Sequence, residues 1–182
     1  MVRGLRDGLE ATPWRELMAS DVGAVTFPTR LAKPAVPVWL KNVRAGIRWH
    51  RTEQGRLDEF GGYSEVYITK PKGADGVRPA GYNRLDHYNA NDRRIRSMKY
   101  TQLADVQPKT ALHYVQEAGT KYVDGTPIAD VRSTPAALRG RNLEGVTILH
   151  IPVQTSPVPP DVIALARKLR VRIMDPTGKV YR

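Results

Sequence analysis

The amino-acid sequence predicts a mixed α/β domain, and three observations support this fold class. Short runs of β-branched and aromatic residues alternate with segments whose apolar residues recur at helical spacing. Residues typical of turns separate these runs, and no internal repeat or low-complexity tract interrupts them. The chain has 182 residues, of which 41% are hydrophobic, so it can bury one sizeable core. We therefore expect one domain with a tail.

The first 42 residues differ in composition from the rest of the chain. They contain four prolines, at positions 13, 28, 34 and 37. Because proline lacks a backbone N–H and disrupts helices, residues 1–42 are expected to be an extended lead-in or linker segment. Apolar residues then recur near helical spacing between residues 43 and 60. This pattern predicts a helix that ends at Gly61 and Gly62 and opens a domain of residues 43–182.

Three strands are predicted next. Residues 63–69 are rich in β-branched and aromatic residues, and a loop rich in proline and glycine follows them. Residues 82–88 and 93–100 flank the tetrapeptide Asn-Ala-Asn-Asp at 89–92, which has the composition of a turn. These two segments are therefore expected to form a β-hairpin.

The C-terminal half continues the alternation of helices and strands. Pro108 can occupy the first turn of a helix, and the apolar residues after it predict a helix of about four turns that ends near Gly125. The remaining elements are expected to be a strand at 146–153, a short helix at 160–169, and a terminal hairpin with strands at 171–174 and 180–181.

The charge of the chain indicates the class of its partner. Lys and Arg outnumber Asp and Glu by 29 to 18, which gives a formal net charge of +11 at pH 7. The excess is spread along the whole chain, so a polyanion such as nucleic acid is the expected partner. A solvated basic surface without a specific ligand, or a ribosome-associated protein, would show the same charge.

Composition also excludes several classes of site. The chain has no cysteine, so a disulfide framework and a cysteine zinc site are both excluded. A metal would have to be held by carboxylate, imidazole or backbone oxygen. No stretch approaches the roughly 18 apolar residues that a membrane-spanning helix needs, and no apolar run follows the N-terminus to form a signal peptide. We therefore expect no membrane-spanning segment, and export would depend on another segment or machine.

The predicted hairpin brings three chemically active side chains together. Side chains alternate along a strand, so Ser97 and Lys99 project from the same face about 6.6 Å apart. A turn centred near residues 90 and 91 pairs Asp86 with Ile95, which shares that face. Asp86, Ser97 and Lys99 are therefore expected to converge on one patch.

Such a patch has the parts of a metal-dependent phosphodiesterase. The Asp86 carboxylate can bind a divalent cation, the backbone carbonyl of Met98 can supply a second oxygen, and the Lys99 ammonium can orient a metal-bound water. Glu65, one strand upstream, can supply a second carboxylate, and magnesium needs only one or two. The alternative is a surface ion pair between Asp86 and Lys99, worth about 0–1 kcal/mol and without function.

The order of these residues also resembles a known kind of site. Glu65, Asp86 and the tripeptide Ser97-Met98-Lys99 resemble the PD-(D/E)xK site of restriction-endonuclease-like nucleases, in the variant in which serine replaces the second-strand carboxylate. The chain is most similar to the nuclease toxin domains of CdiA-type contact-dependent growth inhibition proteins, in particular their DNase branch. The similarity covers residues 43–182, and it implies a restriction-endonuclease-like core with a mixed central β-sheet flanked by helices.

The resemblance implies a role for each residue. Glu65 and Asp86 would be metal ligands, Lys99 would be the catalytic lysine, and Ser97 would occupy the position of the missing carboxylate. Gln102 would join the site, because related nucleases often carry glutamine shortly after the lysine; its alternative is a polar cap at the start of a helix. The cofactor would be a divalent metal ion (zinc, magnesium or manganese), and a site with only two carboxylates favours one ion over two.

The family also implies partners and a location. An acidic cognate immunity protein would neutralise the toxin, and a larger carrier protein or secretion system would deliver it to act in the cytoplasm of a target cell. DNA is the favoured substrate, because the Ser-x-Lys variant resembles the DNase branch. The alternatives are cleavage of tRNA, which sister toxins on the same fold carry out, and a non-catalytic protein that binds nucleic acid.

Basic residues surround the predicted site and would contact the nucleic acid. Arginine neutralises phosphates, and tyrosine can stack on bases. A solubilising face of the hairpin is the alternative. The residues expected to bind nucleic acid are Arg78, Arg84, Arg93, Arg94, Arg96 and Tyr100.

Overall fold

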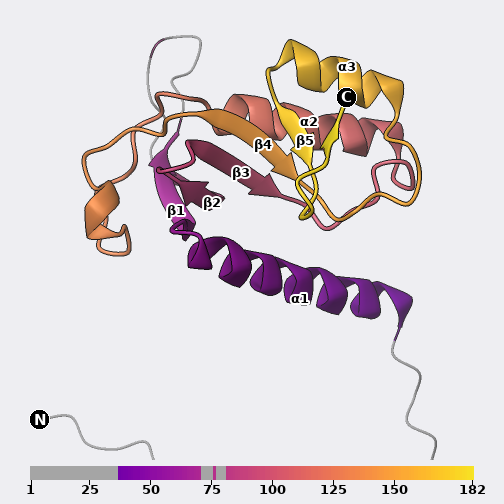
Figure 1. Cartoon of the computed structure of the whole chain (residues 1–182), viewed down its shortest axis with the longest axis horizontal. Coiled ribbons are helices and arrows are strands. Elements are labelled where there is room, and N and C mark those ends of the chain that lie inside the picture. Colours follow the sequence, from indigo (N-terminus) through magenta and orange to yellow (C-terminus); the bar gives the residue numbers. More distant parts are fainter. Residues whose placement is uncertain (1–36, 71–75, 77–80) are drawn as a thin grey trace, which may run out of the picture. The chain divides into compact units, whose positions relative to one another are not determined.

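Six strands form one mixed β-sheet, in the spatial order β1-β2-β3-β4-β5-β6 (Figure 1). The structure, a computed structural model, describes residues 37–70, 76 and 81–182. The main elements are α1 (Val38–Glu59), β1 (Tyr63–Thr69), β2 (Tyr82–Asn89), β3 (Arg94–Met98), α2 (Pro108–Lys121), β4 (Val146–His150), α3 (Pro160–Lys168), β5 (Arg172–Met174) and β6 (Val180–Tyr181).

The sheet combines antiparallel and parallel strands. β1, β2 and β3 pair antiparallel, β3, β4 and β5 pair parallel, and β6 returns antiparallel to β5. Parallel neighbours need a crossover, which α2 provides between β3 and β4 and α3 provides between β4 and β5. α1 lies on one face of the sheet, and α2 and α3 lie on the other (Figure 1). The predicted mixed α/β fold is therefore confirmed.

Most predicted elements are present, and some of their ends differ. β1 has the predicted bounds, whereas β3 ends at Met98 and β4 ends at His150, earlier than the sequence pattern suggests. α1 begins at Val38 instead of residue 43, because Pro37 has an extended conformation just before the first helical turn, where proline is tolerated. The predicted lead-in up to residue 36 lies outside the described residues.

The β2–β3 hairpin has a different register from the predicted one. Tyr88, not Asp86, pairs with Ile95. The turn is centred one residue later than expected, because the Asn89 side chain accepts a hydrogen bond from the Asp92 N–H at 3.0 Å and Arg93 adopts a left-handed conformation with φ 52°. Moving the centre by one residue moves each partner by two, so every side chain keeps its predicted face.

The two faces of the sheet differ in polarity. On the side of α2 and α3 the buried strand residues, such as Leu149 and Ile173, pack among aliphatic side chains of both helices. Each such residue stabilises the fold by about 1.5–3 kcal/mol. On the side of α1 the strands instead bury His87, Arg96 and His150. The layer under α1 therefore holds polar groups that need partners.

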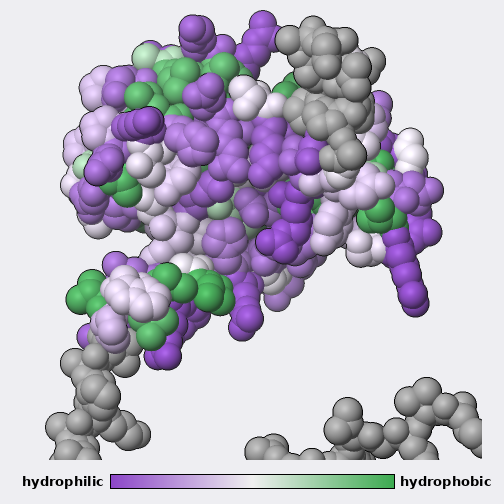
Figure 2. Space-filling view, turned by 180° about the vertical axis from the view of Figure 1, so that it is seen from behind, coloured by the Kyte–Doolittle hydropathy of each residue, from purple (hydrophilic) through white to green (hydrophobic). Residues whose placement is uncertain are grey.

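The N-terminal half of α1 extends beyond the sheet and exposes apolar side chains. Figure 2 shows apolar residues at this end of the molecule and mainly hydrophilic residues over the sheet domain. No helix in the described ranges has both the length and the apolar character needed to cross a bilayer. The exposed apolar residues of α1 are Val38, Trp39, Val43 and Ile47.

We predict that Gly145→Ala strongly destabilises the fold. Gly145 has φ 125°, and an added Cβ would overlap the backbone carbonyl of Arg93. That carbonyl accepts the Val146 N–H at 2.9 Å, the hydrogen bond that starts the parallel ladder between β3 and β4. The combined strain and steric overlap should cost about 3 kcal/mol or more, measured by urea unfolding.

Gly125→Ala is the matched control for this substitution. Gly125 also has a positive φ, 82°, but an added Cβ there would have no neighbour within 4 Å. Only the backbone strain applies, so the expected loss is about 1–2 kcal/mol. Equal losses in the two variants would show that the close approach of Gly145 to β3 does not matter.

Candidate active site

The candidate site lies where β2 and β3 separate. The β2–β3 pairing ends at His87 and Arg96, whereas β3 stays paired with β4 as far as Met98. The N–H of Lys99 donates to the His150 carbonyl on β4 at 2.9 Å, so the N–H of Met98 faces β2. That N–H donates to Oδ2 of Asp86 at 2.7 Å, so a carboxylate occupies the gap between the strands.

Asp86 is an uncompensated carboxylate. Burial raises its pKa above the ordinary value, and the nearby Glu65 carboxylate adds to the effect, while the Met98 N–H, His50 and Lys99 oppose it. Asp86 has no ion pair among the residues that the structure describes. A cation bound here would relieve the cost of its burial.

Glu65 lies on the neighbouring strand and is held in a strained conformation. Its φ of 59° interrupts the β1–β2 ladder at the position that would face Asp86. Its Oε2 forms an ion pair with Arg84 at 2.7 Å, and its Oε1 accepts a hydrogen bond from Gln54 of α1 at 3.0 Å. The same Gln54 amide donates to the backbone carbonyl of Asp86 at 3.2 Å, so α1 connects both predicted metal ligands. Backbone strain of about 1–3 kcal/mol at a non-glycine residue is common at functional sites.

Ser97 is fully buried and has no hydrogen-bond partner within the described residues. Its relative exposure is 0%, and its Oγ is one of three buried side-chain atoms left unpaired there. Ser97 directly follows Arg96, the last β3 residue paired with β2, so it lies where the two strands separate. An unpaired buried hydroxyl costs about 1–3 kcal/mol, so it marks a position that an oxygen of a ligand or water would occupy.

Lys99 pairs with a residue that sequence reasoning did not identify. Its Nζ lies 3.0 Å from Oε2 of Glu117 on α2 and 5.6 Å from the ring centre of Tyr114. The predicted alternative, an ion pair between Lys99 and Asp86, is not seen in the described part of the chain. Hydrogen bonds from Lys99 and Lys121 outweigh burial and hold the pKa of Glu117 below its ordinary value.

The sequence contained a signal for this arrangement. Tyr114, Glu117 and Lys121 recur at positions i, i+3 and i+7 of the predicted helix and therefore share one face. Lys121 lies 3.0 Å from Oε1 of Glu117, so the carboxylate bridges two ammonium groups. This bridge fixes the direction in which Lys99 extends from β3.

Gln102 has a different role from the expected one. Its Nε2 donates to the Val153 carbonyl at 2.9 Å, and its Oε1 accepts the Thr155 N–H at 2.8 Å. The side chain therefore anchors the loop after β4, and within the described residues no hydrogen bond joins it to Asp86 or Lys99. Residue 102 also lies outside any helix, so it is not a helix cap.

The predicted basic residues do not form one surface. Arg84 is paired with Glu65, and Arg93 lies 3.8 Å from Glu144. Arg96 is only 4% exposed, because it points into the layer under α1 instead of toward solvent.

The remaining members of the predicted basic set are dispersed. Tyr100 is exposed and packs against Trp49 of α1, with ring centroids 5.8 Å apart. Arg94 is exposed and has no ion pair among the described residues. Arg78 lies outside the residues that the structure describes.

A basic row on α1 was missed by the sequence reasoning. Its side chains are exposed, and none has an ion pair within the described ranges. Their spacing of three, four and three residues places them on one side of the helix, which is the signal that could have identified them. The row consists of Lys41, Arg44, Arg48 and Arg51.

The predicted metal ligands already have other partners. In residues 37–70, 76 and 81–182, no group of three or more His, Asp or Glu side chains could hold a metal ion. Both carboxylate oxygens of Glu65 are engaged, by Gln54 and Arg84, and one oxygen of Asp86 accepts the Met98 N–H. Comparisons with family models, curated proteins and solved structures give no match for this chain.

We predict that Asp86→Asn leaves the protein at least as stable as the wild type at pH 7. The amide oxygen can still accept the Met98 N–H, and the half-buried charge is removed. Because the pKa of Asp86 is raised in the folded state, the wild type loses stability as the pH rises from the ordinary pKa of an aspartate to the raised one. The stability difference between variant and wild type should therefore grow with pH, measured by urea unfolding from pH 4 to 8.

Asp86→Ala provides the contrast. It leaves the buried Met98 N–H without an acceptor, so we expect a loss of about 1–3 kcal/mol. If Asp86→Asn were as destabilised as Asp86→Ala, the charge itself would be required for folding, and the argument for an uncompensated carboxylate would be lost.

Proposed function

We propose that this protein is a metal-dependent endonuclease that hydrolyses phosphodiester bonds of DNA on a restriction-endonuclease-like core. The observation that carries the proposal is the Asp86 carboxylate in the gap between β2 and β3, beside the unpaired Ser97 hydroxyl. Lys99 is close enough to Asp86 to favour its ionised form without forming an ion pair with it. The mixed sheet with helices on both faces agrees with the same resemblance.

Each residue then has a distinct role. When bound, a divalent cation would supply a Lewis acid that lowers the pKa of a water and offsets charge on the phosphate. Asp86 and Glu65 would hold the cation, with Ser97 as a neutral oxygen donor. Lys99, oriented by Glu117, would place positive charge where negative charge develops on the phosphate oxygens.

The toxin role is supported by the resemblance rather than by the site geometry. It implies an acidic immunity protein and delivery by a larger carrier into the cytoplasm of a target cell. The net charge of +11 agrees with both a polyanionic substrate and an acidic partner.

A cleavage assay tests the proposal. Purified protein is incubated with plasmid DNA and with total tRNA, with EDTA or with added magnesium, manganese or zinc. We expect plasmid cleavage that EDTA abolishes, and a loss of at least about 100-fold in rate for Asp86→Asn and Lys99→Met. Glu117→Gln should reduce the rate less, because Lys99 is kept but loses its orienting partner.

Glu144→Gln is the control, since the ion pair of this exposed carboxylate in the described part of the chain is with Arg93, away from Asp86 and Lys99. Full activity in Asp86→Asn or Lys99→Met would remove the proposed site. Cleavage of tRNA alone would change the substrate, and cleavage of neither substrate with any metal would leave a non-catalytic binding protein as the better description.

We further predict that the basic row on α1 contributes to DNA affinity. Replacing Lys41, Arg44, Arg48 and Arg51 by Gln should weaken binding to duplex DNA in EDTA. If all four contact phosphates, the slope of log Kd against log salt concentration should fall by about 3 to 4 units. Fluorescence anisotropy with a labelled duplex measures this slope.

A second variant with the same loss of charge separates this row from net charge alone. It replaces four exposed cations on or next to α2 and α3, Lys109, Arg167, Lys168 and Arg170, by Gln. We expect the slope of log Kd against log salt concentration for this variant to stay close to that of the wild type. Similar slopes in both quadruple variants would show that α1 has no special role in binding.

A further inference from the structure

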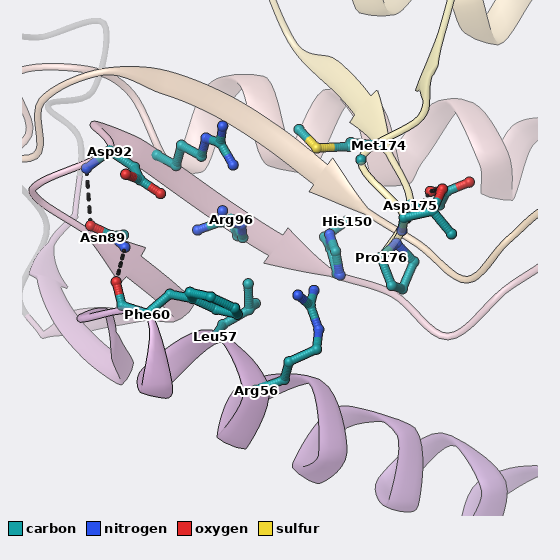
Figure 3. A pocket seen from close by; sticks show the side chains of 13 residues that line it. Arg56, Leu57, Phe60, Asn89, Asp92, Arg96, His150, Met174, Asp175 and Pro176 are labelled. Atoms are coloured by element: carbon teal, nitrogen blue, oxygen red, sulfur yellow. Dashed lines mark hydrogen bonds between the residues drawn. The ribbon is translucent and has the colours of Figure 1, made fainter.

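A polar cavity lies on the opposite side of the sheet from Lys99. Its volume is about 330 Å³, at the lower end of the range of about 300–1,000 Å³ for small-molecule sites. α1 contributes Arg56 and Phe60 to its lining, the end of the β2–β3 hairpin contributes Asp92 and Arg96, and β4 contributes His150 (Figure 3).

Arg96 is a buried cation without a carboxylate partner. Its residue is 4% exposed, and its one hydrogen bond within the described residues joins Nη1 to Nδ1 of His87 at 3.2 Å. A histidine ring carries no negative charge in either protonation state, so His87 does not balance the guanidinium. Burial and Arg94 lower the pKa of Arg96 to about 10, which still leaves it charged. A buried charge without a counter-ion is costly.

The nearby carboxylates do not neutralise this guanidinium. Asp175 accepts hydrogen bonds from Thr177, Lys179 and Tyr181, so both of its oxygens are used by its own turn. Glu53 pairs with Arg56 at 2.8 Å and with His150.

Asp92 is the remaining carboxylate of the cavity. It is exposed on the turn of the hairpin, and its charge favours the charged form of Arg96 without forming an ion pair with it. Arg94, which also lines the cavity, is exposed and has no ion pair among the described residues. The cavity thus contains two arginines, Arg94 and Arg96, that form no ion pair within the described residues.

His150 adds an unused acceptor. Its Nε2 lies 3.1 Å from Oε2 of Glu53, and hydrogen bonds from Arg56 and His150 outweigh burial and keep the pKa of Glu53 low. Since this carboxylate is ionised, Nε2 carries the proton and Nδ1 is a bare acceptor. Nδ1 is buried and has no partner in the described chain. A hydroxyl on a bound anion would satisfy it.

We propose that this cavity binds a phosphate group, with Arg96 and Arg94 contacting its anionic oxygens and His150 accepting from its hydroxyl. A phosphate carries both the negative charge that Arg96 lacks and, in its monohydrogen form, the donor that His150 lacks. The site faces away from Lys99, because Arg96 and Lys99 project from opposite faces of the sheet. The proposal therefore does not depend on nuclease activity.

Thermal unfolding and calorimetric titration with inorganic phosphate, at constant ionic strength set by chloride, test the site on the full chain. We expect a saturable rise in Tm for the wild type, because a ligand that binds only the folded state stabilises it. Arg96→Met should fold with an equal or higher Tm, since it removes a buried charge, and should lose at least about tenfold in phosphate affinity. Arg94→Gln, at an exposed position, should weaken binding without any effect on folding.

Two further variants are expected not to weaken phosphate binding. Asp92→Asn removes a negative charge beside Arg96 and should tighten phosphate binding. Arg172→Gln removes an exposed positive charge that does not line the cavity, so it should bind like the wild type. A phosphate response that is absent in the wild type, or equal in Arg94→Gln, Arg96→Met and the wild type, would overturn the proposal.

Competition with short oligonucleotides identifies the source of the phosphate. Displacement of inorganic phosphate only by an oligonucleotide with a 5′-phosphate would assign the site to a terminal phosphate or a free monoester. Equal displacement by the 5′-hydroxyl form would assign it to the nucleic-acid backbone, whose phosphodiesters carry no hydroxyl, and would overturn the His150 contact. Catalysis at Asp86 is measured separately by plasmid cleavage.

Discussion

The parallel ladder between β3 and β4 is the constraint on which both candidate sites depend. It fixes the alternation along β3, so that Ser97 and Lys99 project toward α2 while Arg96 and Met98 project toward α1. A slip of one residue would exchange these sets and bury Lys99 under α1. The ladder begins at the close approach of Gly145 to Arg93, which only glycine permits. The positions of Lys99 and Arg96 on opposite faces of the sheet therefore depend on the backbone geometry at the start of β3 and β4.

The separation of β2 from β3 follows from this constraint. β3 remains with β4 to its end, so the Met98 N–H loses a strand partner on β2 and takes the Asp86 carboxylate instead. An unpaired buried N–H would cost about 1–3 kcal/mol, which favours keeping the carboxylate in the gap despite the cost of its own burial. The strained backbone of Glu65 on β1 lies beside the same gap. The Asp86 carboxylate therefore satisfies the backbone of β3 and is also the central group of the candidate site.

Local pattern predicted the elements, while tertiary contacts decided the rest. Strand β1 and the hairpin of β2 and β3 follow from alternation and turn composition, although the hairpin register differs by two positions from the predicted one. The partner of Lys99 could not be predicted, because Glu117 reaches it only when α2 crosses over the sheet. The contacts of Gln102 could not be predicted for the same reason, because its partners follow β4. The burial of Arg96 depends on α1 covering a strand that is distant in sequence.

Asp86 and Arg96, on neighbouring strands, each lack an ion-pair partner among the described residues. Asp86 is half-buried in the gap between β2 and β3, and Arg96 is buried under α1. Each charge is costly in the isolated chain, and each cost falls when a ligand of opposite charge binds. A cation for Asp86 and an anion for Arg96 are therefore expected to stabilise the same sheet.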